Sequence, residues 1–335
     1  MITKDKNINI ALAINDQYIG QASALIISIH KNLKEGRFVR INILHSTVTE
    51  QHQDIMKNMV KDFDNISELN FIDMKQFTSN EILDKYLYPN YITSESFYRL
   101  FMPAIFPQYD KMLYLDSDTI VCKDLSQLYN NDIDNFYAGV IKEPISSLEY
   151  NTFFDNERIT NKSYITKKLQ INPKDYFNSG VLLLNLKKLR QDKIQEKFFE
   201  YLLNKSPFRY PDQDVLNIVL YKKVKFLDIL YNLTSPEHNN ENQKRAVIVH
   251  FTGEKKPWIF YKRKETFEQY WKYFKLTPFY KDKEKELYLS LTSGYLDKPF
   301  IKIREEKNHY KIKVFFFHFT INKKYVKFFR KNESN

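Results

Sequence analysis

The stretch KMLYLDSDTIV, residues 111–121, leads from an apolar run straight into two carboxylates, Asp116 and Asp118. The apolar run predicts a buried strand. Two like charges at its end repel each other unless a cation lies between them. Residues two apart on an extended chain point to the same side, so both carboxylates can reach one ion, and their oxygens suit Mg²⁺ or Mn²⁺. The alternative is an Asx turn that ends the strand and leaves Asp118 in solvent.

The composition of the chain fits a folded cytoplasmic protein with an anionic partner. Its 335 residues, 43% of them hydrophobic, support one large domain or two modest ones, and 16% aromatic residues exclude a disordered chain. The single cysteine, Cys122, excludes an internal disulfide and fits a reducing compartment. The N-terminus lacks a signal-peptide pattern, and no apolar run is long enough to span a bilayer. A net charge of +11 indicates nucleic acid, a phosphorylated substrate or an acidic membrane as partner.

Strand-like and helix-like segments alternate through the first half of the chain. This order predicts an α/β fold whose mostly parallel sheet carries helices on both faces. Such sheets bind ligands at the carboxyl ends of their strands, where Asn15 and Asp116 both fall. Strands are expected at 7–15, 40–46, 69–74 and 111–118, and helices at 19–33, 49–63 and 95–106.

The second half continues the alternation after an interruption. The polar stretch Lys142–Asp175 is interpreted as a lid or an insertion over the site. A strand and a helix are expected in residues 176–190, a helix from Pro211, and a strand in residues 246–251. From about Tyr261 the chain becomes aromatic and basic, and we expect it to be helical.

Several polar residues outside the acidic pair are candidates for the same site. His250 ends a predicted strand and would complete a metal site that favours Mn²⁺ over Mg²⁺, although an isolated histidine there is more often a hydrogen-bonding residue. Gly253 permits close approach of a ligand, and Lys255 or Lys256 can meet an anion. These features suit a diphosphate, and no P-loop motif occurs.

Further candidates have structural alternatives of comparable weight. Asn178 is predicted to lie just before a strand and is either a turn residue or a ligand. Asp212, Gln213 and Asp214 open a helix, where an acid also satisfies capping and the helix dipole. Arg99 is either an ion-paired scaffold residue or a contact to phosphate or sugar.

Six segments in order resemble the retaining family 8 glycosyltransferases, which include bacterial lipopolysaccharide and lipooligosaccharide galactosyl- and glucosyltransferases. The similarity runs from about Asn7 to Phe279. The segments are NIALAINDQY, SFYRLFMP, KMLYLDSDTIV, YFNSGVLLLNLKKLR, PDQDVLN and VHFTGEKKPW. The resemblance implies a nucleotide-diphospho-sugar transferase fold of the GT-A type, a UDP-galactose or UDP-glucose donor, and Mn²⁺, with Mg²⁺ as the alternative.

The resemblance also assigns roles to residues of this chain. Asp116, Asp118 and His250 would hold the metal, and Asn178, Asp212 and Gln213 would surround the hexose as catalytic residues. The family often has Asp where Asn15 stands, which bears on how uracil is recognised. Trp258 completes the KPW pattern. The donor-binding residues would be Ala13, Asn15, Gln17, Tyr18, Arg99, Ser117, Gly253 and Lys256.

The implied mechanism retains the configuration at the anomeric carbon. The metal and Lys256 would stabilise the departing diphosphate. An amide is a poor nucleophile, so Gln213 would stabilise an oxocarbenium-like centre while the acceptor attacks from the leaving-group side. A covalent intermediate on Asp212 or Asp214 is the alternative.

The domain organisation is expected to be a catalytic domain at 1–280 and a basic aromatic region at 281–335. Residues 300–335 hold 10 Lys and Arg against 3 Asp and Glu, interleaved with aromatic residues. This pattern suits an anionic membrane surface, and predicts a peripheral protein on the inner face of the cell membrane. A hairpin packed on the domain is the alternative. Nucleic acid is disfavoured because no recognised motif occurs.

The predicted function is Mn²⁺-dependent transfer of a hexose from a UDP-sugar to a glycan or a lipid-linked saccharide. A catalytically silent sugar-nucleotide-binding or membrane scaffold is one alternative, and the intact acidic pair, His250 and Lys256 argue against it. A protein glycosyltransferase that modifies Ser, Thr or Tyr is the other.

Overall fold

The chain forms two compact units, Met1–Pro278 and Phe279–Asn335. In the ranges that the structure describes, no helix has both the length and the apolar composition needed to cross a bilayer. The computed structural model describes residues 7–77, 94–154, 157–204, 208–235, 238–253, 256–259, 267–282, 301–305, 309–314 and 317–322.

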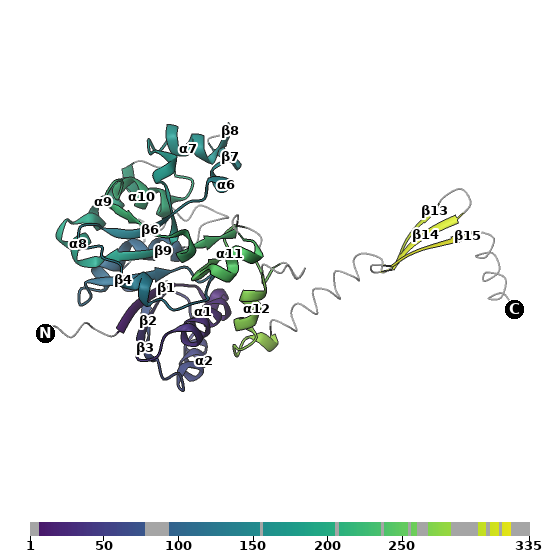
Figure 1. The fold of residues 1–335 in the computed structure, drawn as a ribbon, viewed down its shortest axis with the longest axis horizontal. Helices are drawn as coiled ribbons and strands as arrows, with labels where there is room; N and C mark the ends of the chain where they lie inside the picture. The colour runs from purple at the N-terminus through teal and green to yellow at the C-terminus, as the bar shows by residue number, and fades with distance from the viewer. Residues whose placement is uncertain are drawn as a thin grey trace. The chain divides into compact units, whose positions relative to one another are not determined.

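A seven-stranded sheet forms the centre of the first unit (Figure 1), in the order β10-β6-β9-β4-β1-β2-β3. All neighbouring pairs are parallel except those of β9, which runs antiparallel to both β4 and β6. The prediction of a mostly parallel sheet is therefore confirmed. The strands are β1 Asn7–Ala13, β2 Phe38–His45, β3 Ile66–Asp73, β4 Lys111–Leu115, β6 Ala138–Lys142, β9 Phe177–Asn185 and β10 Val224–Phe226.

Both faces of the central strands are buried. On β1, Ala11 and Ala13 belong to a core that also holds buried residues of the helices α8 (Leu186–Gln191), α9 (Ile194–Asn204) and α10 (Pro211–Val219). The intervening Ile10 and Leu12 are equally inaccessible. Alternate residues of a strand point to opposite faces, so the sheet is covered on both sides, as parallel sheets generally are. This explains why these strands read as nearly continuous apolar runs.

Capping side chains mark where two of the helices begin, whereas the helix predicted at 95–106 is a 3₁₀ helix, Ser94–Phe101, followed by a short α-helix, Met102–Ile105. The Thr49 side chain caps the N-terminus of α2 by accepting a hydrogen bond from the backbone N–H of His52. The Asn185 side chain caps α8 in the same way, accepting from the backbone N–H of Lys188. The α-helices are α1 Ile19–Asn32, α2 Glu50–Val60, α4 Met102–Ile105, α5 Ser126–Tyr129, α6 Ile145–Leu148, α7 Asn161–Lys167, α8 Leu186–Gln191, α9 Ile194–Asn204, α10 Pro211–Val219, α11 Asn240–Arg245 and α12 Glu268–Phe274. Short 3₁₀ helices are η1 Asp16–Tyr18, η2 Met74–Gln76, η3 Ser94–Phe101, η4 Pro173–Asp175 and η5 Ile229–Tyr231.

A second, three-stranded sheet lies next to the acidic pair. Its strands are β11 Leu233–Thr234, β12 Ile248–His250 and β5 Thr119–Val121, in that order. Because β5 follows the turn that carries both acids and pairs antiparallel with β12, Thr119 lies opposite His250. The pairing of these two short strands therefore places His250 next to the two acids, although more than a hundred residues separate them in the sequence.

The segment predicted as a lid or an insertion has structure of its own. It contains α6, the hairpin of β7 Asn151–Phe154 with β8 Glu157–Thr160, α7 and η4. Its buried residues Leu148, Tyr164 and Ile165 form a small separate core with Tyr176. It is thus a compact insertion between β6 and β9.

The prediction that the C-terminal region is helical is wrong for part of its length. The helix α12 agrees with it, whereas β13 Ile301–Glu305, β14 His309–Val314 and β15 Phe317–Asn322 form an antiparallel sheet. Alternation such as His-Tyr-Lys-Ile-Lys-Val in β14 has the period of a strand, and this local pattern prevailed over the general basic and aromatic character. Residues 261–266 and 283–300 lie outside the described residues.

Candidate active site

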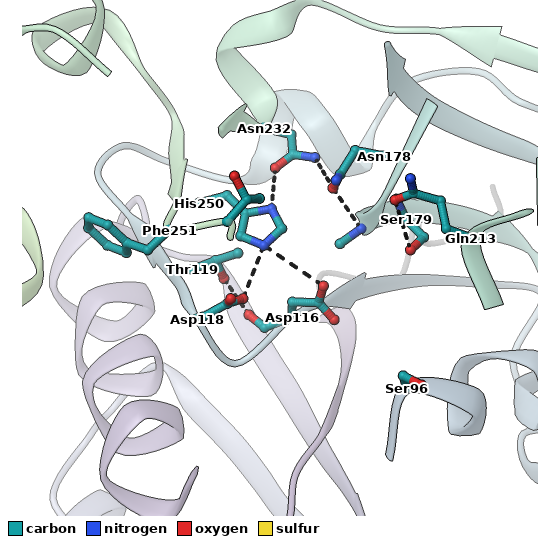
Figure 2. Close-up of polar contacts among 12 residues, drawn as sticks. Ser96, Asp116, Asp118, Thr119, Asn178, Ser179, Gln213, Asn232, His250 and Phe251 are labelled. Atoms are coloured by element: carbon teal, nitrogen blue, oxygen red, sulfur yellow. Dashed lines mark hydrogen bonds and ion pairs between the residues drawn. The ribbon is translucent and has the colours of Figure 1, made fainter. Parts of the chain in front are cut away.

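Three predicted metal ligands converge at the carboxyl end of β4. Asp116 and Asp118 flank the turn between β4 and β5, and His250 ends β12 (Figure 2). The His250 Nε2 atom lies 3.0 Å from Asp118 Oδ1 and 3.8 Å from Asp116 Oδ2. One ligand atom from each residue can be chosen so that all three lie within 4.8 Å of one another. Two carboxylate oxygens and an imidazole nitrogen at this spacing suit a divalent cation.

Lys256 belongs to the same cluster. Its Nζ lies 2.5 Å from Asp118 Oδ2 and 2.6 Å from the Phe251 carbonyl oxygen. Burial disfavours the charged form of Asp118, but Lys256 and His250 outweigh it and hold the pKa of that carboxyl well below its usual range. Asp118 is therefore an ionised carboxylate at physiological pH and can bind a cation. The neighbouring Lys255 lies outside the described residues.

Arg99 is buried and holds Asp116 in place through a hydrogen-bonded ion pair. Burial opposes its charge, yet Asp116, Tyr114 and Asp212 stabilise the guanidinium and raise its pKa above the usual value. Its hydrogen bonds go to Asp116 Oδ1 at 2.8 Å, Ser179 O at 2.6 Å, Ser179 Oγ at 2.9 Å and Ser96 O at 2.9 Å. Four of the five guanidinium hydrogens are thus directed at protein groups, and one on Nη2 has no partner among the described residues.

Gly180 leaves room for the metal-ligand cluster. It lies on β9, and its carbonyl oxygen accepts a hydrogen bond of 2.8 Å from the Asp116 backbone. A Cβ atom at this position would meet His250 Cε1 at 2.3 Å and Asp116 Oδ2 at 2.7 Å. Hence the strand can lie this close to the two ligands only because residue 180 has no side chain.

The three polar residues that open α10 occupy different environments. Gln213 lies in the wall of the larger cavity, where its Oε1 accepts from Ser179 N at 3.0 Å and its Nε2 donates to Tyr176 OH at 3.0 Å. Asp212 is buried beside Arg99, 3.4 Å from its Nε. Burial raises the pKa of Asp212, against the opposing effect of Arg99.

Asp214 is a structural residue of the insertion core. It is fully buried and accepts hydrogen bonds from Tyr176 OH at 2.6 Å, Tyr164 OH at 2.7 Å and Tyr210 N at 2.9 Å. Burial raises its pKa to about 6 despite these bonds. Asp214 therefore joins α10 to the insertion. It lines neither the small nor the larger cavity beside the acidic pair.

A small cavity of about 140 Å³ lies on one side of the acidic pair. The predicted donor-binding residues Ala13, Asn15 and Tyr18 line it together with Arg99 and Ser117. Asn15 Oδ1 is buried there and has no hydrogen-bond partner in the described structure. A buried carbonyl oxygen without a donor is costly, so this atom has an unmet requirement for a hydrogen-bond donor. Gln17 is exposed and lines neither cavity, so its role remains a prediction.

A larger cavity of about 820 Å³ opens on the other side and shares both acids. Asn178, His250, Gly253 and Lys256 line its inner end. Gly253 has φ of +77°, a conformation that favours glycine. The insertion and the segment before α10 supply the outer wall, with Tyr150, Tyr164, Arg209 and Tyr210.

The sequence did not point to two residues of the site, Glu143 in the wall of the larger cavity and Asn232 beside His250. Glu143 directly follows the carboxyl end of β6. Its carboxylate accepts hydrogen bonds from Ser147 Oγ at 2.6 Å and from Asn178 Nδ2 at 3.2 Å. Burial raises its pKa, opposed by those hydrogen bonds. The strand-end rule that located Asp116 would also have found it. Asn232, behind His250, carries no local signal in the sequence. Asn178 is the second residue of β9, and the expectation that it precedes the strand is wrong.

Trp258 braces the loop that carries Gly253 and Lys256. Its ring lies edge-on to that of Tyr18, with 6.0 Å between the centroids, and Lys256 Nζ lies 5.9 Å from the Trp258 centroid. A predicted residue of the small cavity and the predicted diphosphate loop are therefore packed together through this tryptophan.

Known proteins resemble this chain in sequence and in fold. The family described as "Glycosyl transferase family 8" matches residues 9–261. The chain is 28% identical over 266 residues to a "Lipopolysaccharide 1,2-glucosyltransferase" of Escherichia coli, which covers 75% of this chain and 73% of that protein. It is 26% identical over 262 residues to a "Putative glycosyltransferase" of Haemophilus influenzae, covering 76% and 73%.

Solved structures agree with the predicted architecture. The galactosyltransferase LgtC, in complex with donor and acceptor sugar analogs, has a TM-score of 0.62 at 20% identity and covers 81% of this chain and 96% of its own. The bifunctional WbbM has a TM-score of 0.71 at 23% identity and covers 85% of this chain and 52% of its own. These likenesses confirm the α/β fold of the GT-A type.

Proposed function

Because the chain belongs to glycosyl transferase family 8, we propose that it moves a hexose from a UDP-sugar to a hydroxyl of a saccharide or glycolipid, with retention at the anomeric carbon. The observation that carries this proposal is the convergence of Asp116, Asp118 and His250 between two cavities. One cavity has the residues for a nucleotide, and the other has room for the acceptor. A diphosphate would then lie where the two meet.

The residues of the cluster fit a divalent metal, for which Mn²⁺ is the preferred ion and Mg²⁺ the alternative. Asp116, Asp118 and His250 would hold it, and when bound it would act as a Lewis acid toward the diphosphate. Lys256 is paired with Asp118 in the structure and is the nearby cation able to turn toward a phosphate. Gly253 lets the backbone approach the same group. These contacts would strengthen as charge develops on the leaving diphosphate.

The small cavity is proposed to bind the uridine. The unpartnered Asn15 Oδ1 is an acceptor for an N–H of the base, a role that Asp has more often in the family. Tyr18 and Ala13 supply the apolar walls. Arg99 mainly positions Asp116, and its one Nη2 hydrogen without a described partner is available to the donor.

The arrangement at α10 favours attack from the leaving-group side over a covalent intermediate. Asp214 is buried beneath two tyrosines, and Asp212 is buried beside Arg99 and lines neither cavity. Gln213 is the residue of this group that lines the larger cavity. Its amide oxygen, held by Ser179, would stabilise positive charge at the anomeric carbon, while the leaving phosphate oxygen takes the proton of the acceptor. A covalent sugar trapped on Asp212 or Asp214 would contradict this mechanism.

The larger cavity is proposed to bind a saccharide acceptor. Its tyrosines supply flat apolar faces, and its inner end carries Asn178 and Glu143, which can hydrogen-bond hydroxyl groups. Relatives include a lipopolysaccharide glucosyltransferase, so a cell-surface glycan or its lipid-linked precursor is the favoured acceptor class. Glucose and galactose differ at one hydroxyl, and the donor is UDP-glucose or UDP-galactose.

The C-terminal region 281–335 is proposed as a membrane attachment that follows a catalytic domain at 1–280. Lys302 is the register partner of Lys313, and Arg304 that of Lys311, so basic positions coincide across β13 and β14. A segment with several basic residues of this kind is attracted to anionic lipids. The protein would then work as a peripheral protein on the inner face of the cell membrane, close to a lipid-linked acceptor.

A panel of UDP-sugars tests the proposed function directly. Purified protein is incubated with each sugar nucleotide and Mn²⁺, and release of UDP is measured with and without saccharide acceptors. We expect hydrolysis of UDP-glucose or UDP-galactose that is lost when a chelator is added. Failure to hydrolyse or bind any UDP-hexose in the presence of Mn²⁺ would refute the proposal.

A further inference from the structure

A chain of amide hydrogen bonds lies behind the proposed metal ligand His250 (Figure 2). The Gly180 backbone N–H donates to Asn178 Oδ1 at 3.0 Å, and Asn232 Nδ2 donates to the same oxygen at 2.9 Å. Asn232 Oδ1 in turn lies 2.9 Å from His250 Nδ1. Asn232 and His250 are both almost fully buried, at 1% and 3% exposure. Water therefore cannot readily replace a lost partner.

The backbone fixes the direction of every bond in this chain. A backbone N–H can only donate, so the Asn178 atom that faces Gly180 is the oxygen. The Asn232 atom that faces this oxygen must then be its NH₂ group, which turns the Asn232 oxygen toward His250. Because that oxygen can only accept, His250 Nδ1 must carry a hydrogen. Asn178 Nδ2 donates to Glu143 Oε2 at 3.2 Å, which agrees with the same orientation.

This constraint decides what the other ring nitrogen can do. With the hydrogen on Nδ1, a neutral imidazole has its free electron pair on Nε2. Nε2 is the atom that faces the two carboxylates, 3.0 Å from Asp118 Oδ1. Histidines that bind metals are commonly oriented in this way by a hydrogen bond at the opposite nitrogen.

We propose that Asn232 is a positioning residue for metal binding, which acts by holding His250 in the Nδ1-protonated tautomer and in the rotation that aims Nε2 at the acids. The inference rests on the proposed metal site and deepens it. Asn232 touches neither acid and lines neither cavity, and of its two side-chain partners, His250 and Asn178, only His250 is a proposed metal ligand, so its effect on the metal would pass through His250. Among the described residues it is the one hydrogen-bond partner of His250 Nδ1.

The inference is tested by the affinity of the metal-free, full-length protein for Mn²⁺, measured by calorimetry or by the electron paramagnetic resonance signal of free Mn²⁺. Loss of an orienting partner of this kind typically weakens metal binding about 10- to 100-fold. We expect Asn232→Ala to show that loss. Asn232→Asp keeps an oxygen that accepts from Nδ1 but loses the donor to Asn178 Oδ1, so we expect its Mn²⁺ affinity to lie between that of Asn232→Ala and that of the unaltered protein. If Asn232→Ala fails to fold, Asn232→Leu, which fills a similar volume, takes its place.

Asn185→Ala is the matched control. Asn185 is also a buried amide, and it uses both side-chain atoms, donating to Ile133 O at 3.1 Å and accepting from Lys188 N at 3.0 Å. It lies at the opposite end of β9 from Asn178. We expect Asn185→Ala to lower the melting temperature but to leave Mn²⁺ affinity unchanged.

A double-mutant cycle tests whether the effect passes through His250. In a His250→Ala background, the added Asn232→Ala change is expected to weaken Mn²⁺ binding no further. The inference is overturned if Asn232→Ala binds Mn²⁺ as tightly as the unaltered protein, if Asn185→Ala loses as much affinity, or if the two losses add in the cycle. If the unaltered protein does not bind Mn²⁺ at all, the proposed metal site itself has failed, which is a distinct result.

Discussion

Replacing Gly180 by alanine tests whether the metal-ligand cluster is the centre of the activity. The new Cβ would lie 2.3 Å from His250 Cε1, 2.7 Å from Asp116 Oδ2 and 2.9 Å from His250 Nδ1. Ordinary van der Waals contacts begin at 3.4 Å, so the imidazole would have to recede by about 1.1 Å, which is the difference between 3.4 and 2.3 Å. The clashing atoms belong to two of the three proposed ligands.

The size of this shift sets the expected loss of function. Metal–ligand distances tolerate only about 0.2 Å, so a ring displaced by about 1 Å cannot share an ion with both acids. Misplacement of about 1 Å in a catalytic group commonly costs on the order of 100-fold in rate. Overpacking also costs about 1–3 kcal/mol of unfolding free energy, or about 2–4 °C in melting temperature for each kcal/mol. The rate is therefore expected to fall much more than the stability.

The assay compares Gly180→Ala with Gly139→Ala on the adjacent strand β6. At Gly139 the nearest atom to a new Cβ is Leu227 Cδ1, at 2.9 Å, the movable end of a flexible side chain. We expect Gly139→Ala to keep Mn²⁺ affinity and Mn²⁺-dependent release of UDP, and Gly180→Ala to lose both about 100-fold or more. If a folded Gly180→Ala protein keeps both properties within threefold, the metal-ligand cluster is not the centre of the activity.

Three further predictions concern other parts of the molecule. Asp118→Asn removes a metal ligand and the partner of Lys256, so Mn²⁺-dependent transfer is expected to vanish with the circular dichroism spectrum unchanged; full activity of this variant would remove the metal assignment. The folded-state pKa of Asp214, about 6, lies above the ordinary value of 3.8, so the folded protein binds more protons than the unfolded chain between these pH values, and the free energy of unfolding falls as pH rises through that window. In urea titrations Asp214→Asn is expected to make this pH dependence shallower, and an unchanged slope would contradict the buried environment assigned to Asp214. Vesicles containing anionic lipid are expected to float the full-length protein but not a chain that ends at Lys298, and equal flotation of the two would exclude a membrane role for the C-terminal region.

The sequence alone determined much of the architecture and the choice of chemistry. The strands and amphipathic helices of the first half could be predicted from the local sequence, because the spacing of apolar residues reflects which faces are buried. The acids Asp116 and Asp118 were recognisable as candidates because two carboxylates so close at a strand end repel each other unless a cation lies between them. Six motifs in order identified the family, and together they named the distant His250 as a partner of those acids.

The direction of β9 and the separate roles of the polar residues could be seen only in the folded protein. A buried strand reads the same whether its neighbours run parallel or antiparallel, so the sequence could not show that β9 lies reversed between β4 and β6. The three polar residues Asp212, Gln213 and Asp214 look alike in sequence, yet one faces a cavity, one pairs with Arg99 and one is buried under tyrosines. Asn232 has no local signal at all. Its importance depends on the direction of hydrogen bonds that pass from a backbone amide to an imidazole, and this direction exists only once the segments have packed together.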